Sequence, residues 1–178
     1  VGCVDSGSDA RDGGIFMKTT DGGETWSTKY INARDGYSKG KSKDVYLTNF
    51  SFYDEKSGLL SGFTYDYAIG KFPFICKTED GGETFKDISP RVTKNDWYIG
   101  REIVSINYMN ENDACAIVNS GVGSEFLLIS DYSVTSFEKS NYESNFSQRG
   151  RFFSSVFLGR FIAYFTGIIQ GRSQILKT

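Results

Sequence analysis

The sequence predicts an all-β protein built from repeated units of four antiparallel strands, and three observations support this. The segment KTTDGGETW, Lys18 to Trp26, recurs almost unchanged as KTEDGGETF, Lys77 to Phe85. Aromatic residues make up 16% of the chain, and 20 Gly accompany only 2 Pro, a mix that favours short strands and tight turns over helices. Several runs alternate apolar and polar residues, which is the period of a strand.

The runs follow one another in a fixed order around each copy of the motif. A first run (VYLTNFSF, EIVSINY and FFSSVF) is followed by a second (GLLSGF, ACAIV and AYFTGII), and VGCV at the start fits the second class. A third run ends in Lys-Thr before the motif turn, and a fourth begins at the motif aromatic. Four strands per roughly 50 residues is the period of a β-propeller blade.

We therefore predict one partial β-propeller domain over residues 1–178. Its units cover about residues 1–31 (the last three strands of a blade), 45–88, 102–139 and 151–178 (the first three strands of a blade). Propellers close with about four blades or more. The sequence thus predicts an incomplete set of blades, which needs further blades or a second copy of the chain for closure.

The composition of the motif indicates a turn between the third and fourth strands. Glycine adopts positive φ without steric strain, and a short Asp side chain accepts hydrogen bonds from the N–H groups of a turn. We expect the aromatic rings of Trp26 and Phe85 to be buried between blades. Because Asp21 and Asp80 complete the same local turn, we predict a structural and not a catalytic role for both.

A third, degenerate copy follows in LLISDYSVTSF, where Ser133 replaces the second glycine and the aromatic comes one position late. The last unit ends in ILKT, which matches the Lys-Thr ends of the earlier third runs. The residues to which we assign the structural motif are Thr19, Asp21, Gly23, Thr25, Trp26, Thr78, Asp80, Gly82, Thr84, Phe85, Asp131, Thr135 and Phe137.

The pattern Ser/Thr-x-Asp-x-Gly-x-Thr-Trp/Phe resembles the Asp box, also called the BNR repeat. Asp-box propellers include sialidases, sortilin-like receptors, xyloglucanases and photosystem II assembly-factor-like proteins. The amino-acid sequences of the two full motifs look most like those of this last group and its bacterial relatives. The resemblance implies a propeller of four-stranded blades and an extracytoplasmic location, whether periplasmic, secreted or surface-anchored.

The connections between successive blades are long and carry cations and aromatic rings to one face of the predicted propeller. Loops on a rigid scaffold are frequent binding sites. A partial ring of positive charge there suits an acidic peptide, a carboxylated glycan or a phosphate, although basic residues are also common in loops simply because water solvates them. With two tyrosines from the loop around residues 64–70, the candidate binding residues are Arg34, Tyr37, Lys39, Lys43, Tyr65, Tyr67, Trp97, Tyr98, Arg101, Arg149 and Arg151.

Other features argue against several classes of protein. The net charge of −2 gives no polycation for nucleic acid, and without histidine there is no Ser-His or Cys-His nucleophile pair. No CxxC occurs, and we read Cys3, Cys76 and Cys115 as small buried hydrophobes. Lipidation of Cys3 is a second interpretation. The sequence predicts no cofactor and no metal, and the acidic loop DSGSDARD is read as a polar loop in preference to a calcium site.

The segment Phe152 to Ile169 is apolar enough to suggest a membrane span, but Arg160 lies in its middle. We predict two consecutive buried strands with a turn near Gly159 instead, and no transmembrane segment.

Three functions are compatible with these residues. The first is a non-enzymatic binding or assembly scaffold that recognises an acidic protein or glycan through the face of the inter-blade loops. The second is a fragment of a glycoside hydrolase; here the Arg-Ile-Pro segment that the sialidase resemblance implies is absent, although Arg101 and Arg151 remain candidates for its arginine triad. The third is an inhibitor or immunity-type protein that covers another protein with its propeller face.

Overall fold

The computed structural model describes residues 14–31, 44–66, 70–90, 101–119, 126–139, 150–157, 162–169 and 172–177. Across these ranges the only regular secondary structure is the β-strand, and no helix occurs in them. The all-β prediction is confirmed.

The strands form four antiparallel sheets, which we number in chain order. Within each sheet, every strand pairs with the strand that follows it in the sequence. Sheet 1 contains β1 (Gly14–Lys18) and β2 (Ser27–Ile31); sheet 2 contains β3 (Asp44–Phe52), β4 (Gly58–Asp66), β5 (Gly70–Thr78) and β6 (Lys86–Asp87). Sheet 3 contains β7 (Glu102–Tyr108), β8 (Ala114–Asn119), β9 (Phe126–Ser130) and β10 (Phe137–Lys139); sheet 4 contains β11 (Gly150–Phe157), β12 (Ala163–Ile169) and β13 (Arg172–Lys177).

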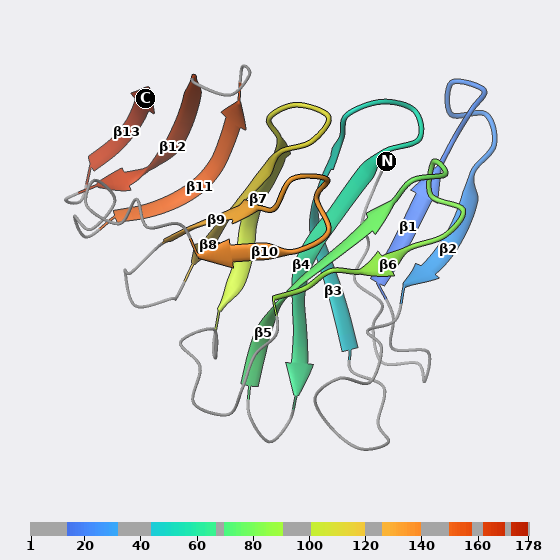
Figure 1. Cartoon of the computed structure of the whole chain (residues 1–178), viewed down its shortest axis with the longest axis horizontal. Helices are drawn as coiled ribbons and strands as arrows, with labels where there is room; N and C mark the ends of the chain where they lie inside the picture. Colours follow the sequence, from blue (N-terminus) through green and yellow to red (C-terminus); the bar gives the residue numbers. More distant parts are fainter. Residues whose placement is uncertain are drawn as a thin grey trace.

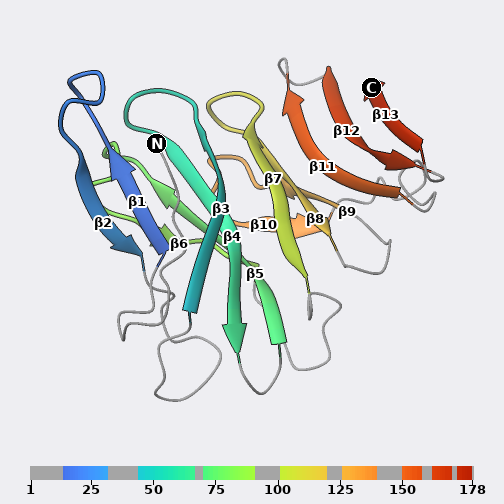
Figure 2. The ribbon, with the colours of Figure 1, turned by 180° about the vertical axis from the view of Figure 1, so that it is seen from behind.

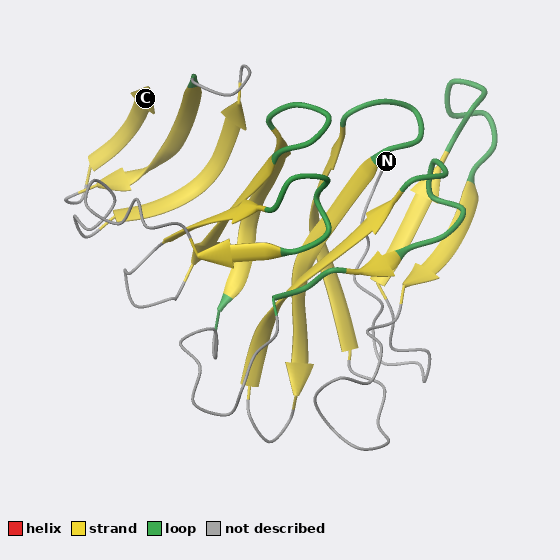
Figure 3. Cartoon of the chain, in the orientation of Figure 1, coloured by secondary structure: helices red, strands yellow, loops and turns green. Residues whose placement is uncertain are grey.

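The sheets follow one another in space in the order of the chain, from sheet 1 (blue) to sheet 4 (red), in both Figure 1 and Figure 2. Successive strands run in opposite directions, so the turns after β3 and β5 lie at one edge of sheet 2, while the last residue of β4 and the first of β5 pair at the other. We call the edge with residues 19–26, 79–85 and 131–136 the turn face; these turns are among the green segments of Figure 3. The opposite edge, where β4 ends and β5 and β7 begin, is the loop face.

The core lies between the sheets, as expected when sheets pack face to face. One cluster joins sheets 1 and 2 and contains Phe16, Ile31, Val45, Leu47, Leu60, Phe74 and Cys76. A larger cluster joins sheets 2 and 3 and contains Leu59, Phe72, Ile75, Ile88, Ile103, Ile106, Ala114, Ala116, Val118, Leu128, Val134 and Phe137.

The first strands of sheets 2, 3 and 4 share a break in register. The pairing with the next strand skips one residue after Leu47, after Ile103 and after Phe152. A bulge of this kind turns side chains out of the regular alternation. The strands are joined across sheets by amide groups: Asn49 Nδ2 donates to Ile103 O at 3.2 Å, and Asn107 Nδ2 donates to Ser155 O at 3.2 Å. The repeated bulge thus accompanies repeated sheet-to-sheet hydrogen bonds.

Cys76 and Cys115 are buried free thiols, as predicted, and burial raises the pKa of the Cys115 thiol well above its ordinary value. Cys3 lies outside the described residues. The described residues contain no helix that could cross a membrane.

The apolar segment Phe152 to Ile169 forms β11 and β12, and the proposed turn at Gly159 lies outside the described residues. The expectation that both strands are buried was wrong for one face of sheet 4. Val156, Ile168 and Ile175 are exposed large hydrophobic side chains there. The physical reason is that no other described sheet packs on that face.

Candidate functional site

The turn between β1 and β2 is organised by the carboxylate of Asp21. Asp21 Oδ1 accepts hydrogen bonds from the backbone N–H of Thr25 at 3.0 Å and from the hydroxyl of Thr19 at 2.7 Å, while Oδ2 accepts from the Thr25 hydroxyl. The Thr19 hydroxyl oxygen in turn accepts from the N–H of Gly23 at 2.8 Å. The side chains of Thr19, Asp21 and Thr25 therefore hold the turn closed.

The turn between β5 and β6 repeats these bonds one for one. Asp80 Oδ1 accepts from Thr84 N and from the Thr78 hydroxyl, both at 2.8 Å, and the Thr84 hydroxyl donates to Oδ2. Gly82 N donates to Thr78 Oγ1 at 2.8 Å. The duplicated sequence thus produces a duplicated hydrogen-bond network.

These bonds keep both carboxylates ionised. Hydrogen bonds from the hydroxyl and backbone N–H of Thr25 hold the pKa of Asp21 well below the usual range of an Asp. The same two groups of Thr84 do so for Asp80. Both oxygens of each carboxylate already accept hydrogen bonds from groups in the turn. A carboxylate with so low a pKa is also a poor general acid, because it is not protonated at neutral pH. The chemistry of these turns therefore favours a structural over a catalytic use.

The third turn follows the same plan with a shifted backbone. Asp131 accepts from Thr135 N at 2.7 Å, from the Thr135 hydroxyl and from Ser136 N at 2.9 Å. Positive φ occurs at Ser133 (85°) and Val134 (52°), whereas in the first two turns it occurs at the glycine pairs beginning one residue after the Asp. Ser133 therefore has the positive φ of the second glycine, which it replaces. The two residues with positive φ, however, begin two positions after the Asp in this turn and one position after it in the first two turns.

The turn glycines of sheet 2 lie directly against sheet 1. A Cβ added to Gly82 would meet Phe16 Cε1 at 2.4 Å, and one added to Gly81 would meet Glu55 O at 2.8 Å and Lys18 Nζ at 3.1 Å. Lys18 Nζ donates to Gly81 O at 3.0 Å. The turn is thus both a local structure and the contact surface for the preceding sheet.

The contact recurs between sheets 2 and 3. Lys77, which holds in β5 the position that Lys18 holds in β1, donates from Nζ to Ser133 O at 2.8 Å. Val134 is fully buried in the cluster between these sheets. Each Lys-Thr lysine of β1 and β5 therefore bonds a backbone carbonyl in the motif turn of the next sheet.

The motif aromatics differ in burial. Phe85 lies edge-on to Phe16, with ring centroids 5.3 Å apart, and Phe137 is buried. Trp26 is 46% exposed, and its Nε1 donates to Gly23 O at 3.1 Å. The predicted burial of Trp26 between blades was therefore wrong, because no described strand precedes sheet 1 to cover the ring.

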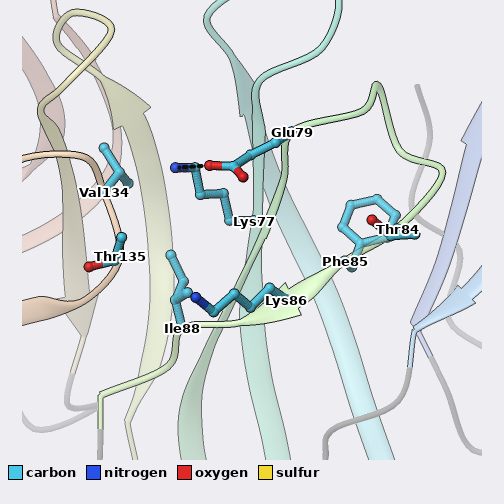
Figure 4. A pocket seen from close by; sticks show the side chains of 8 residues that line it. All are labelled: Lys77, Glu79, Thr84, Phe85, Lys86, Ile88, Val134 and Thr135. Atoms are coloured by element: carbon cyan, nitrogen blue, oxygen red, sulfur yellow. Dashed lines mark ion pairs between the residues drawn. The ribbon is translucent and has the colours of Figure 1, made fainter.

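A pocket of about 150 Å³ opens on the turn face between sheets 2 and 3. Figure 4 shows the Val134–Thr135 turn on one side of it and β6 on the other. One of its two lysines is already paired: Lys77 Nζ lies 2.7 Å from Glu79 Oε1, and this pairing lowers the pKa of Glu79. The pocket is lined by Lys77, Glu79, Thr84, Phe85, Lys86, Ile88, Val134 and Thr135.

Most of the predicted binding residues lie outside the described residues. These are Arg34, Tyr37, Lys39, Lys43, Tyr67, Trp97, Tyr98 and Arg149. Arg151 belongs to β11, where it pairs in register with Ile168. Tyr65 and Arg101 are described, and both lie at the loop face: Tyr65 is exposed near the end of β4, and Arg101 directly precedes β7.

Arg101 lies beside a group of residues that the sequence analysis missed. Lys71 Nζ pairs with Glu102 Oε2 at 2.9 Å, which ties β5 of sheet 2 to β7 of sheet 3. The same ammonium lies 4.1 Å from the centroid of the Phe63 ring, on which Tyr46 stacks at 4.7 Å. We call Tyr46, Phe63, Tyr65, Lys71, Arg101 and Glu102 the loop-face rim.

The register of the sheet explains why the rim forms. Tyr46 pairs with Phe63, and Tyr65 pairs with Lys71, so these side chains lie on one face of sheet 2 near the ends of its strands. Partial burial lowers the pKa of Arg101, so water solvates its charge less fully than that of an exposed arginine. The alternation of side chains along β3 and β4 could have identified Tyr46 and Phe63 as residues on the same face as Tyr65.

Within the described ranges, no three His, Cys, Asp or Glu side chains gather into a possible metal site. The acidic loop of residues 5–12 lies outside those ranges.

No family model matches the sequence, and no curated protein matches it. Among solved structures, the chain is similar to YCF48 bound to a D1 peptide, with a TM-score of 0.54 and 16% sequence identity. The match covers 74% of this chain and 36% of the other, so the chain spans about a third of the structure it resembles. With the four-stranded antiparallel sheets, this similarity shows a β-propeller fold with an incomplete set of blades.

Proposed function

We propose that this protein is a non-enzymatic propeller scaffold that binds an acidic segment of a protein partner through its loop face. The observation that carries the proposal is the loop-face rim at the junction of sheets 2 and 3, where stacked aromatic rings and the Lys71–Glu102 pair lie next to the start of β7, which Arg101 directly precedes. The similar propeller YCF48 is bound to a peptide of D1, which supports a protein ligand for this fold.

The charges of the rim favour an anionic ligand. Lys71 Nζ pairs with Glu102 Oε2 at 2.9 Å, and Arg101 adds a second cation to the rim. A partly desolvated guanidinium gains more from a carboxylate than a fully hydrated one does, and its planar fork matches both carboxylate oxygens. Tyr65 and the stacked pair of Tyr46 and Phe63 offer flat apolar surface on the same rim, beside Lys71.

The remaining parts of the proposal rest on the Asp-box resemblance, for the location, and on the cations and aromatic rings of the inter-blade loops, for the second ligand class and the further residues. They are an extracytoplasmic location, an acidic glycan as a second ligand class, and contributions from Arg34, Tyr37, Lys39, Lys43, Tyr67, Trp97, Tyr98, Arg149 and Arg151 on the same face.

A binding titration tests the proposal. The probe is a short fluorescein-labelled peptide rich in Glu and Tyr, compared with the same peptide carrying Gln in place of Glu. We expect the acidic peptide alone to raise the anisotropy, and binding to weaken as salt is added because exposed charges are screened. Arg101→Glu should weaken binding at least roughly tenfold, which corresponds to about 1.4 kcal/mol.

The matched control is Lys56→Glu, which makes the same charge change in an exposed turn at the opposite edge of sheet 2. If both variants lose affinity equally, binding reflects net charge and the assignment to the loop face is wrong. Hydrolysis of a fluorogenic sialoside or a β-glucan by the same sample, without peptide binding, would replace the scaffold with a glycoside hydrolase.

A further inference from the structure

The contact between sheets 1 and 2 and the contact between sheets 2 and 3 have the same form. In β1, Phe16 packs against Gly82 of the next sheet and Lys18 bonds Gly81 O. In β5, Ile75 is completely buried against sheet 3, and Lys77 bonds Ser133 O. An apolar residue and a lysine two positions later thus form the donor half of the contact.

The strand β13 repeats this donor half. Lys177 pairs with Tyr164 of β12 as Lys77 pairs with Leu59 of β4, and Ile175 pairs with Thr166 as Ile75 pairs with Ser61. The burial is opposite: Ile175 is 73% exposed, whereas Phe16 is 3% and Ile75 0% exposed. Ile175 and Lys177 therefore present an unfilled copy of a contact that is filled twice elsewhere in the chain.

The other residues on that side of sheet 4 extend the surface. Register places Val156, Tyr164, Thr166, Ile168, Ile175 and Lys177 on one side of the sheet, which we call the open face. Ser155 and Phe165 point to the other side, where both are buried and Ser155 Oγ lies 2.9 Å from Ser105 Oγ of sheet 3. The open face is therefore the side turned away from sheet 3.

The acceptor half of the contact is also present and unfilled, in the turn of sheet 1. Among the described residues, nothing lies within 4 Å of a Cβ added to Gly22, and one added to Gly23 meets only Trp26, at 3.8 Å. Their counterparts Gly81 and Gly82 are covered by Lys18 and Phe16. Trp26 is the counterpart of Phe85, which packs on Phe16, but it is half exposed.

We propose that the open face of one copy docks head to tail on the turn of residues 19–26 of a second copy. In this interface Lys177 Nζ donates to the carbonyl of Gly22, and Ile175 packs against Gly23 and Trp26. The interface is heterologous, since the two copies contribute different surfaces. The described residues of each copy form four sheets, so two copies supply eight, which is within the roughly four to eight blades of closed propellers.

Sedimentation velocity over a range of protein concentrations tests the proposal. We expect the parent chain to associate. Ile175→Asp, on the donor side, and Trp26→Glu, on the acceptor side, should each weaken association at least roughly tenfold, because each buries a charge in an apolar contact. Tyr132→Asp is the matched control, since Tyr132 is 75% exposed and lies in neither half.

Mixing the two variants distinguishes a head-to-tail interface from any other. Each variant keeps one intact half, so a mixture of Ile175→Asp with Trp26→Glu should form a heterodimer although neither variant associates alone. Circular dichroism melting confirms that both are folded. A parent chain that stays monomeric, or variants that do not complement each other, would overturn the proposal; a monomer would indicate that these halves receive further blades.

Discussion

A methyl group placed on Gly82 would lie 2.4 Å from the Cε1 atom of Phe16, in the preceding sheet. Gly82 also has a φ of 94°, which L side chains rarely adopt. The second glycine of the motif thus meets two requirements at once, one from its own turn and one from the neighbouring sheet. This double requirement explains why the glycine pair is repeated together with the Asp.

Gly82→Ala should therefore lower the free energy of unfolding more than Gly23→Ala. Both glycines have positive φ, 94° and 102°, so both variants lose about 1–2 kcal/mol from backbone strain. Only Gly82 faces Phe16, and the overpacking there adds about 1–3 kcal/mol. Urea denaturation of the two variants measures the difference, and equal losses would show that Phe16 does not sense the turn.

Ser133→Gly should stabilise the protein. Ser133 is exposed and has a φ of 85°, so a glycine there relieves backbone strain. Glycine also has more conformational entropy in the unfolded chain, which opposes this gain, so the net stabilisation is up to about 1 kcal/mol. The control is Tyr132→Gly, at an exposed neighbour whose φ is not positive, which should be destabilising. Thermal melting compares the two, and a lower melting temperature for Ser133→Gly would contradict the strain argument.

Lys77→Met should be destabilising, because the side chain is only 12% exposed and its ammonium bonds Ser133 O. Loss of this charge-assisted hydrogen bond, together with the packing of the largely buried lysine side chain, lowers the free energy of unfolding by about 1–3 kcal/mol. Lys86→Met changes an exposed lysine that lines the same pocket and should change it by less than about 0.5 kcal/mol. Chemical denaturation of both variants tests whether the bond to the next sheet, and not the charge of the pocket, is responsible.

Asp80→Asn should reduce stability near neutral pH, and its difference from the parent should disappear in acid. The folded pKa of Asp80 lies below the unfolded value of about 3.9, so the carboxylate contributes stability above that value and loses it as the pH falls through the folded pKa. Glu24→Gln, in the exposed turn of sheet 1, is the control. Unfolding free energies measured from neutral to strongly acidic pH give the answer; a deficit that persists unchanged in acid would mean that Asp80 does not act through its charge.

Much of the fold could be predicted because the repeat fixes it locally. The alternation of VYLTNFSF and its counterparts identified strands, and the Lys-Thr ends located the turns. The shifted turn at Ser133 and Val134 could not be predicted from the same pattern. There the buried Val134 side chain stabilises a backbone that its own residue type disfavours, and that burial depends on sheet 2.

The candidate site was predicted less completely, because it depends on contacts between sheets. Arg101 and Tyr65 were identified from their types and positions, but Lys71 and Glu102 lie far apart in sequence and meet only where sheets 2 and 3 join. The exposure of Trp26 was missed for a related reason. The local sequence identifies Trp26 as the aromatic residue at the end of the turn, but it does not show whether another sheet covers its ring.

A double-mutant cycle between Phe16→Val and Gly82→Ala tests most directly the central claim that the repeated motif serves contact between blades. If Gly82→Ala is harmful because its methyl group meets Phe16, its effect should shrink by about 1 kcal/mol or more once Phe16 is Val. Additive effects, within about 0.5 kcal/mol, would show that the two residues act independently and would contradict the account.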